Sequence, residues 1–291
     1  MTAARPGPVR VDGEMLAVKR TAGYVHLTVV APGVAERFRP GSFVALAVGG
    51  PLSDRCLRRG FPIYRVRASG TYGGTVEVVA EPDEPGTRWL AGLPAGSPVD
   101  VLGPLGRPFA LPKEPVSCVL VGERRGCAPL FPLAERLRER GCAVHMLLGA
   151  ADERSLFGTL EARRAARTVM VATEDGSVGM RGGVVDVLPD LLVRTGADVV
   201  YASGSFPMLH AAARAAERHG AWSQTAVPAP DGCGTGLCLG CVLPVVGEDG
   251  LTRMVRACTE GPVFRGDRVR WDDVGTVPTD AWGAVTPEAA P

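Results

Sequence analysis

The amino-acid sequence predicts a multidomain β and α/β protein. In it, an antiparallel β-barrel, a Rossmann-like parallel α/β domain and a small cysteine-rich domain follow one another. Short β-type runs broken by Gly and Pro fill the first hundred residues, and β-type and helical segments then alternate. Near the C-terminus, four of the eight cysteines gather within 26 residues. We therefore expect three domains, at 9–112, 113–224 and 225–275.

The first of these regions has the strand spacing of an all-β barrel. Its apolar runs are short, and Gly or Pro closes most of them, which favours antiparallel strands joined by tight turns. The expected strands are 25–32, 42–50, 60–68, 74–82 and 97–104.

The second region alternates β-type runs with helical patterns, which predicts a doubly wound parallel sheet. In the first expected helix, Leu130, Leu133, Ala134 and Leu137 fall at helical spacing. Ligands bind such sheets at the carboxyl ends of the strands. The expected strands are 116–122, 142–150, 168–175 and 197–204, and the expected helices are 129–140, 153–164, 184–194 and 207–219.

Two further features concern the end of the chain and its scattered cysteines. A hairpin is expected to turn at Asp249 and Gly250, and the Pro-, Ala- and Thr-rich tail after Val274 is expected to be loose. Cys118 and Cys142 lie in apolar runs, which indicates small buried core residues.

Composition argues against several classes of partner. The net charge is +1, no apolar run is long enough to span a membrane, and no apolar segment follows the first ten residues as in a secretory signal. We expect no nucleic-acid or membrane partner, and a cytoplasmic location.

The clustered cysteines carry the most specific signal in the chain. Cys233, Cys238, Cys241 and Cys258 have the spacing C-x4-C-x2-C-x16-C, which is that of plant-type 2Fe-2S ferredoxins. Interleaved glycines would let the loop wrap closely around the sulfurs. The alternative is a zinc site, although structural zinc sites favour paired C-x2-C knuckles. A 2Fe-2S cluster held by four thiolates predicts one-electron transfer.

Beyond this spacing, residues 10–272 resemble the electron transfer subunit of class B dihydroorotate dehydrogenase, in the ferredoxin reductase superfamily. The resemblance implies an FAD-binding barrel, a domain for NAD(P)H and a C-terminal 2Fe-2S domain. The motifs that carry it are CGTGLCLGCVLPV and CTEGPVF around the cysteines, LGPLGRPF at 102–109, PGTRWL at 85–90 and LRRGFPIYRV at 57–66.

The resemblance also implies cofactor-binding residues, whereas no catalytic residue is assigned. Arg59 would face the FAD pyrophosphate, with the next three residues beside the isoalloxazine, and a Gly-Thr pair would begin a helix near phosphate. Two loops at the ends of Rossmann strands would receive the nicotinamide nucleotide. The implied residues are Arg59, Gly60, Phe61, Pro62, Gly86 and Thr87 for FAD, and Gly122, Gly126, Ser203 and Gly204 for the nucleotide.

The resemblance further implies electron flow between NAD(P)H, FAD and the cluster, because a flavin connects two-electron and one-electron carriers. The implied partner is an FMN-containing dehydrogenase subunit, in a heterotetramer. Pro62, Glu81, Glu123 and Ser203 depart from the family pattern. Two alternatives therefore stay open, namely a divergent paralogue serving another flavoenzyme, and a non-catalytic subunit that keeps the metal site for structure.

Overall fold

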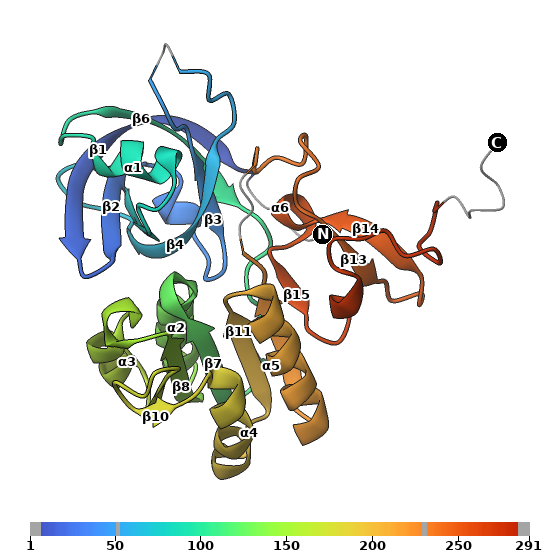
Figure 1. The fold of residues 1–291 in the computed structure, drawn as a ribbon. Coiled ribbons are helices and arrows are strands. Elements are labelled where there is room, and N and C mark those ends of the chain that lie inside the picture. The colour runs from blue at the N-terminus through green and yellow to red at the C-terminus, as the bar shows by residue number, and fades with distance from the viewer. Residues whose placement is uncertain (1–6, 51–52, 229–231, 285–291) are drawn as a thin grey trace.

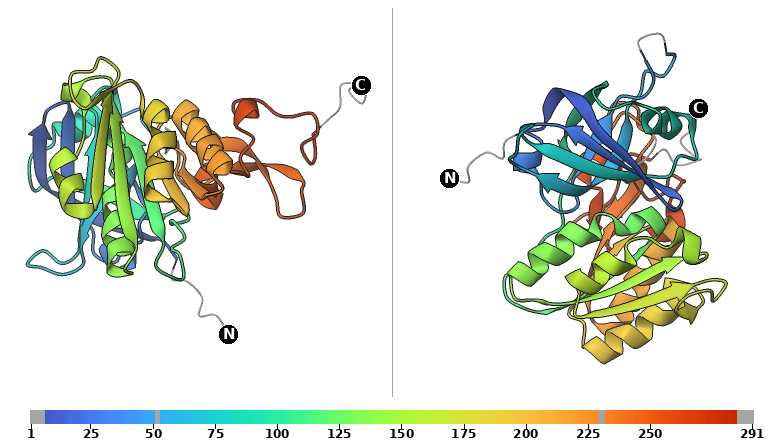
Figure 2. Two further views of the ribbon diagram at one scale, coloured as in Figure 1. Left: turned by 90° about the horizontal axis from the view of Figure 1, so that it is seen from below. Right: turned by 90° about the vertical axis from the view of Figure 1, so that its left-hand side faces the viewer.

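The computed structural model describes residues 7–50, 53–228 and 232–284, which form a barrel, a sheet flanked by helices, and a C-terminal group of elements (Figure 1). Most of the N-terminal segment in which no secretory signal is expected lies outside the described residues. In Figure 2 the hairpin of the C-terminal group projects away from the barrel and the sheet. None of the helices in the described ranges is long and apolar enough to cross a membrane.

The barrel is closed and antiparallel, with strand order β1-β2-β5-β4-β3-β6, as predicted. The first strand was not among the expected segments. It is long and charged, and it carries a register shift between Met15 and Ala17 that bends it around the barrel. The elements are β1 (Val9–Thr21), β2 (Tyr24–Val30), η1 (Ala35–Arg37), β3 (Phe43–Leu46), β4 (Arg59–Arg67), β5 (Thr75–Ala80), α1 (Pro85–Ala91) and β6 (Pro98–Leu105).

Strand β4, which carries the expected flavin residues, is fixed on both sides. Its Arg59, Gly60, Phe61 and Pro62 pair with Leu46 to Phe43 of β3 in antiparallel register. Phe61 is buried in the barrel core, and by strand alternation its neighbours face the other way. The preceding residue is held as well, because the Arg58 guanidinium donates to Asp100 Oδ1 on β6 at 2.6 and 2.9 Å.

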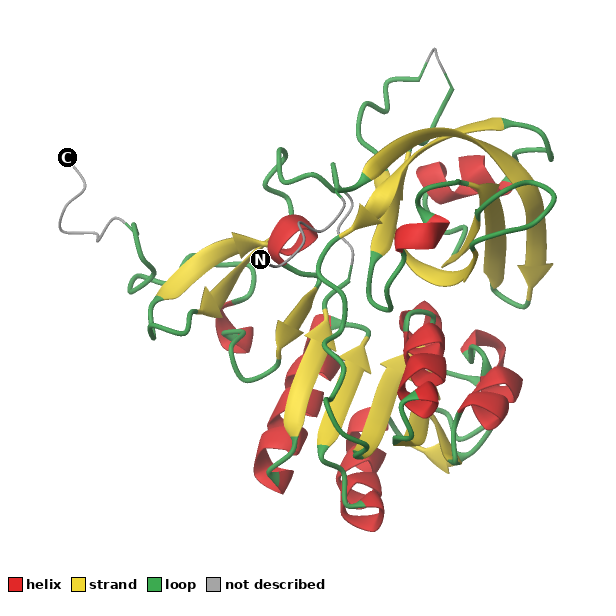
Figure 3. Cartoon of the chain, turned by 180° about the vertical axis from the view of Figure 1, so that it is seen from behind, coloured by secondary structure: helices red, strands yellow, loops and turns green. Residues whose placement is uncertain are grey.

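The second layer is a seven-stranded sheet of order β10-β9-β8-β7-β11-β12-β15 (Figure 3). From β7 the chain runs outward to β8 and β9, and then returns to the other side of β7 for β11 and β12. The order therefore reverses between β7 and β11, which is the topological switch point of a doubly wound sheet. Its parallel strands are β7 (Ser117–Glu123), β8 (Ala143–Ala150), β9 (Thr168–Thr173), β10 (Met180–Arg181), β11 (Val199–Ser203) and β12 (Trp222–Ala226).

The helices confirm the predicted pattern except at one place. The expected helix 153–164 is interrupted, because Gly158 has φ +75° and separates a short turn from the helix that follows. A Cβ on Gly158 would lie 2.2 Å from Phe131, so this position requires glycine. The elements are η2 (Arg124–Cys127), α2 (Leu130–Glu139), η3 (Glu153–Ser155), α3 (Thr159–Ala165), α4 (Val184–Thr195) and α5 (Phe206–His219).

The C-terminal group contains the predicted hairpin, in which Val246 pairs with Thr252 across the turn at Asp249 and Gly250. A later strand, β15, returns to the large sheet and pairs antiparallel with β12. The elements are β13 (Val242–Val246), β14 (Thr252–Arg256), α6 (Ala257–Glu260), β15 (Val263–Arg265) and η4 (Trp271–Asp273).

The tail after Val274 is not loose as far as residue 284. The Trp282 N–H donates to the Thr252 carbonyl at 2.8 Å, and Arg270 pairs with Asp280 at 2.6 Å. These contacts hold the segment against β14. The last residues of the expected loose tail lie outside the described ranges.

One apolar core joins the three groups. Phe43 and Leu105 of the barrel belong to the same buried cluster as Val119 of the sheet and the two C-terminal cysteines, Cys241 and Cys258. Buried side chains of the three groups therefore pack against one another. Cys118 and Cys142, the two cysteines predicted to be core residues, are buried as expected.

Candidate functional site

The four clustered cysteines come together in two pairs. Cys241 and Cys258 are buried, and their sulfurs lie 3.3 Å apart. Cys233 and Cys238 lie nearer the surface and exchange hydrogen bonds, since each backbone N–H donates to the other's sulfur at 3.4 Å. The structure thus brings the four predicted ligands together two by two.

The loop directs backbone amides at the sulfur of Cys233. The N–H groups of Thr235 and Leu237 donate to it at 3.3 and 3.2 Å, in addition to that of Cys238. Partial burial alone would raise the pKa of the Cys233 thiol, but hydrogen bonds from Thr235 and Cys238 outweigh it and lower the pKa to about 6. The thiolate, which is the form that binds metal, is therefore favoured here.

Two pairs of thiols are the arrangement that a two-iron cluster needs, with one pair for each iron. Within the residues that the structure describes, no three His, Cys, Asp or Glu side chains are close enough together to hold one metal ion. The observed donor set, with amides aimed at sulfur, fits a 2Fe-2S cluster.

The cysteine loop lies directly on the barrel. Gly234 has φ +69°, and a Cβ there would lie 3.1 Å from Ala45 and 3.5 Å from both Leu105 and Phe43. Phe43 in turn pairs with Pro62 of the expected flavin strand. Only one strand, β3, therefore separates the cysteine loop from β4.

Two adjoining cavities, together called the cleft, lie between the barrel and the sheet. The smaller one has a volume of about 200 Å³ and the larger one about 350 Å³, and they share Glu81, Asp83 and Arg125 in their walls. All predicted cofactor residues except Gly86 and Gly122 line one or the other. Arg59, Gly60, Phe61 and Thr87 line the smaller cavity, and Pro62, Gly126, Ser203 and Gly204 line the larger one.

The two exceptions are packing residues in this structure. A Cβ on Gly86 would lie 3.3 Å from Val48, and one on Gly122 would lie 2.9 Å from Leu130. Both glycines allow close approach of neighbouring elements and thereby shape the cavities from behind.

The charges in the cleft are arranged in pairs. Arg59 lies 3.5 Å from Glu84, and Glu81 receives Arg124 at 3.1 Å and Arg125 at 3.4 Å. From the sequence, Glu81 is only a departure from the family pattern, with no link to the arginines of the loop after β7. The sequence does hold a signal that could have linked these residues. Glu81 is acidic, Arg124 and Arg125 are basic, and side chains of opposite charge can form ion pairs.

Glu123, which the sequence marks as a departure from the family pattern, is the last residue of β7. Its Oε1 accepts a hydrogen bond from the Ser205 N–H at 2.9 Å, at the start of α5. The carboxylate therefore lies across the crevice between the ends of β7 and β11.

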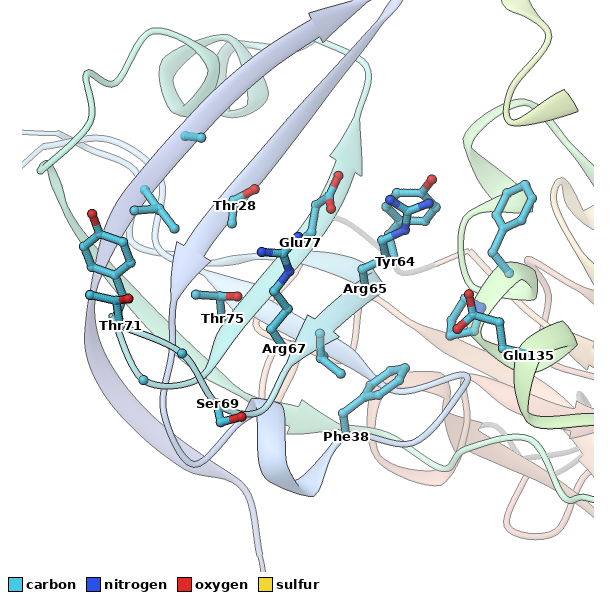
Figure 4. A pocket seen from close by; sticks show the side chains of 18 of the residues that line it. Thr28, Phe38, Tyr64, Arg65, Arg67, Ser69, Thr71, Thr75, Glu77 and Glu135 are labelled. Carbon is cyan, nitrogen blue, oxygen red and sulfur yellow. The ribbon is translucent and has the colours of Figure 1, made fainter. Parts of the chain in front are cut away.

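A further cavity, of about 620 Å³, lies on the outer wall of the barrel beside α2 (Figure 4). Arg65 in its wall forms an ion pair with Glu161 of α3, and Arg67 and Glu77 come from adjacent strands. None of the predicted site residues is among its lining residues. It is a separate feature from the cleft.

Comparison with known proteins agrees with this geometry. Residues 232–270 match the family model described as the iron-sulfur cluster binding domain of dihydroorotate dehydrogenase B. The electron transfer subunit of dihydroorotate dehydrogenase B (NAD(+)) from Geobacillus thermodenitrificans is 36% identical over 247 residues, covering 84% of this chain and 91% of that protein. This chain belongs to the family of dihydroorotate dehydrogenase B electron transfer subunits. The subunit from Desulforamulus reducens is 30% identical, covering 90% of this chain and 98% of its own length.

Solved structures extend the likeness to the whole fold. The structure of an NADH-dependent reduced ferredoxin-NADP oxidoreductase, determined in work on flavin-based electron bifurcation, has a TM-score of 0.77 and 26% identity, covering 91% of each chain. A ferredoxin NADP+ reductase from Neisseria gonorrhoeae with bound FAD and NADP has a TM-score of 0.60 at 17% identity, covering 73% of this chain and 92% of that one. The chain therefore has the ferredoxin reductase fold with an iron-sulfur binding domain at its C-terminus.

Family membership settles the general activity. As a dihydroorotate dehydrogenase B electron transfer subunit, the chain is an oxidoreductase component that works with a separate catalytic subunit. The predicted family and activity are confirmed. The assignments of individual site residues and the three domain boundaries stay predictions.

Proposed function

We propose that this chain passes electrons between a nicotinamide nucleotide, an FAD in the interdomain cleft and a 2Fe-2S cluster on Cys233, Cys238, Cys241 and Cys258. From there, electrons would pass to or from an FMN-containing catalytic subunit in a heterotetramer. When bound, FAD would connect a two-electron donor with a one-electron cluster. The observation that carries the proposal is the packing of the cysteine loop on β3, one strand away from the expected flavin residues.

The cleft has the chemistry that FAD requires. Its smaller part presents the guanidinium groups of Arg59 and Arg125, which can bind a pyrophosphate through charge-assisted hydrogen bonds. Its larger part has apolar walls that include Phe43, Pro62 and Val79, as a flat aromatic ring needs. Glu81 and Glu84 each contact arginine, which neutralises two of the four acidic side chains that line the cleft.

Pro62, one of the residues expected beside the flavin ring, limits what this wall of the cleft can offer a cofactor. Pro62 has no N–H and no polar side-chain atom, so it can only provide an apolar surface. Arg125 lines both cavities, so its guanidinium could donate to a bound cofactor from either part of the cleft.

The surface beside the exposed cysteine is suited to a protein partner. Leu237 is 84% exposed and Leu239 is 61% exposed, on either side of Cys238. Exposed apolar side chains next to a redox group favour a docking surface that brings a partner's cofactor close to it. The proposed cytoplasmic location rests on the grouped cysteines, which are not joined in disulfides and therefore suit a reducing compartment.

Replacing Leu237 with Asp should weaken binding of the FMN-containing catalytic subunit by about 10- to 150-fold, because one buried leucine contributes about 1.5–3 kcal/mol. Titration calorimetry on the two purified subunits would measure the change. Leu160→Asp on α3, which alters a side chain that is 73% exposed, is the matched control and should bind as the wild type does. Equal affinities for all three proteins would contradict this docking surface.

The proposal as a whole is tested by the anaerobic absorbance spectrum of the purified protein, with iron and zinc analysis, before and after NADH is added. We expect flavin and 2Fe-2S bands that both bleach with NADH. Iron-sulfur bands without flavin would instead favour the paralogue that serves another flavoenzyme. Zinc without iron would favour the structural subunit.

A further inference from the structure

The crevice at the switch point of the sheet is where this fold receives a dinucleotide. It lies between the carboxyl ends of β7 and β11, which are in register, with Gly122 opposite Ser203. The next residues along each strand, Glu123 and Gly204, therefore face one another across the crevice.

In this chain, the side chain of Glu123 reaches across that crevice and forms part of the wall of the larger cavity. A Cβ on Gly204 would lie 2.9 Å from Glu123 Cγ and 3.2 Å from its Oε1. The same oxygen accepts the Ser205 N–H, the backbone donor that precedes the 14-residue helix α5. Such a donor at a helix N-terminus favours an anion, so Glu123 takes the position that a phosphate would favour.

The loop that carries Glu123 is held by ion pairs to the barrel. Arg124, with φ +51°, and Arg125 both contact the carboxylate of Glu81, whose side chain is 12% exposed. Because these pairs join the end of β5 in the barrel to the loop after β7, they keep the Glu123 backbone at the crevice. Opening the crevice requires Glu123 to leave the Ser205 amide.

We propose that Glu123 is an internal anion that competes with the phosphate of the nicotinamide nucleotide for the N-terminus of α5, and so sets the affinity of this chain for that nucleotide. The inference rests on the proposed nicotinamide site. It makes Glu123 a residue that determines affinity and specificity, because neutral or weakly charged ligands would not face the same competition.

The test is titration calorimetry of NAD+ with the oxidised full chain, which requires no turnover. Glu123→Gly should lower the Kd for NAD+ by about tenfold, and Glu123→Gln should lower it by a smaller factor, because an amide is a weaker acceptor than a carboxylate. Glu139→Gln, which removes an exposed carboxylate at the end of α2, is the control and should bind as the wild type does. Circular dichroism melting would show that each variant is folded.

A second variant tests the anchoring step. Glu81→Gln releases Arg124 and Arg125 without altering Glu123, and it should also lower the Kd for NAD+. If the Glu123 variants bind NAD+ no more tightly than the wild type and Glu139→Gln, the inference is overturned.

NAD+ affinity tests the role of Glu123, and bleaching by NADH tests the proposed function. Tight NAD+ binding by the wild type, unchanged in the variants and accompanied by bleaching with NADH, would overturn the role of Glu123 and leave the proposed function intact. Failure of every variant to bind NAD+ would overturn the inference. If NADH then bleached no band that dithionite bleaches, the nicotinamide step of the proposed function would fail as well.

Discussion

Replacing Cys258 with Ala should remove the cluster almost completely, so that iron falls from about two atoms per chain to near zero. Cys258 is buried, and its sulfur lies 3.3 Å from that of Cys241. Its loss leaves one iron of a two-iron cluster with a single protein thiolate, and leaves Cys241 beside a hole in the shared core. Iron analysis and the visible spectrum of the purified variant measure the effect.

Cys142→Ala is the matched control, because Cys142 is also a buried free cysteine but lies far along the chain from the cluster loop. It should keep its iron, with a modest loss of stability from the small cavity. Flavin content should be unchanged in both variants, because the cleft is lined by other residues. A Cys258→Ala protein that retained two irons would contradict the assigned ligand set.

Sequence patterns predicted the parts of this fold that depend on residues close together in the chain. The Gly- and Pro-broken strands, the βα alternation, the hairpin at Asp249 and Gly250 and the four cluster cysteines all depend on residues near one another in the sequence. A strand as long and charged as β1 escaped notice, since its alternation is masked by exposed polar residues and a bend near Met15.

Features that depend on distant contacts could not be predicted in the same way. The return of β15 to the edge of β12 and the docking of the tail on Thr252 are tertiary pairings with no local signal. In the candidate site, Glu81 is an isolated departure in the sequence, and only the structure shows that it forms an ion pair with Arg124 between the barrel and the sheet. Glu81 follows β5 and Arg124 follows β7, so their opposite charges can be paired only once these two strands are placed in space.

The contact between the cysteine loop and the barrel offers a second large effect, at Gly234. Gly234→Val should displace the cysteine loop from β3. It adds a branched side chain at φ +69°, where even a Cβ would lie 3.1 Å from Ala45. We expect about 1–3 kcal/mol of overpacking cost beyond the backbone strain itself. Iron release to a chelator should be about tenfold faster, because 1.4 kcal/mol is a factor of about ten, and reduction of the cluster should lag behind reduction of the flavin.

The backbone strain can be measured separately at Gly250, which has φ +79° in the turn of the β13–β14 hairpin and where a Cβ would have no neighbouring atom within 4 Å. Gly250→Val should lower the free energy of unfolding by about 1–2 kcal/mol, which is the cost of the left-handed conformation alone. It should keep its cluster and its electron transfer. If the two variants released iron equally fast and reduced the cluster at the same rate, the packing of Gly234 on β3 would have no part in coupling the cluster to the cleft. A difference confined to Gly234→Val would show that this one-strand contact holds the two redox sites together.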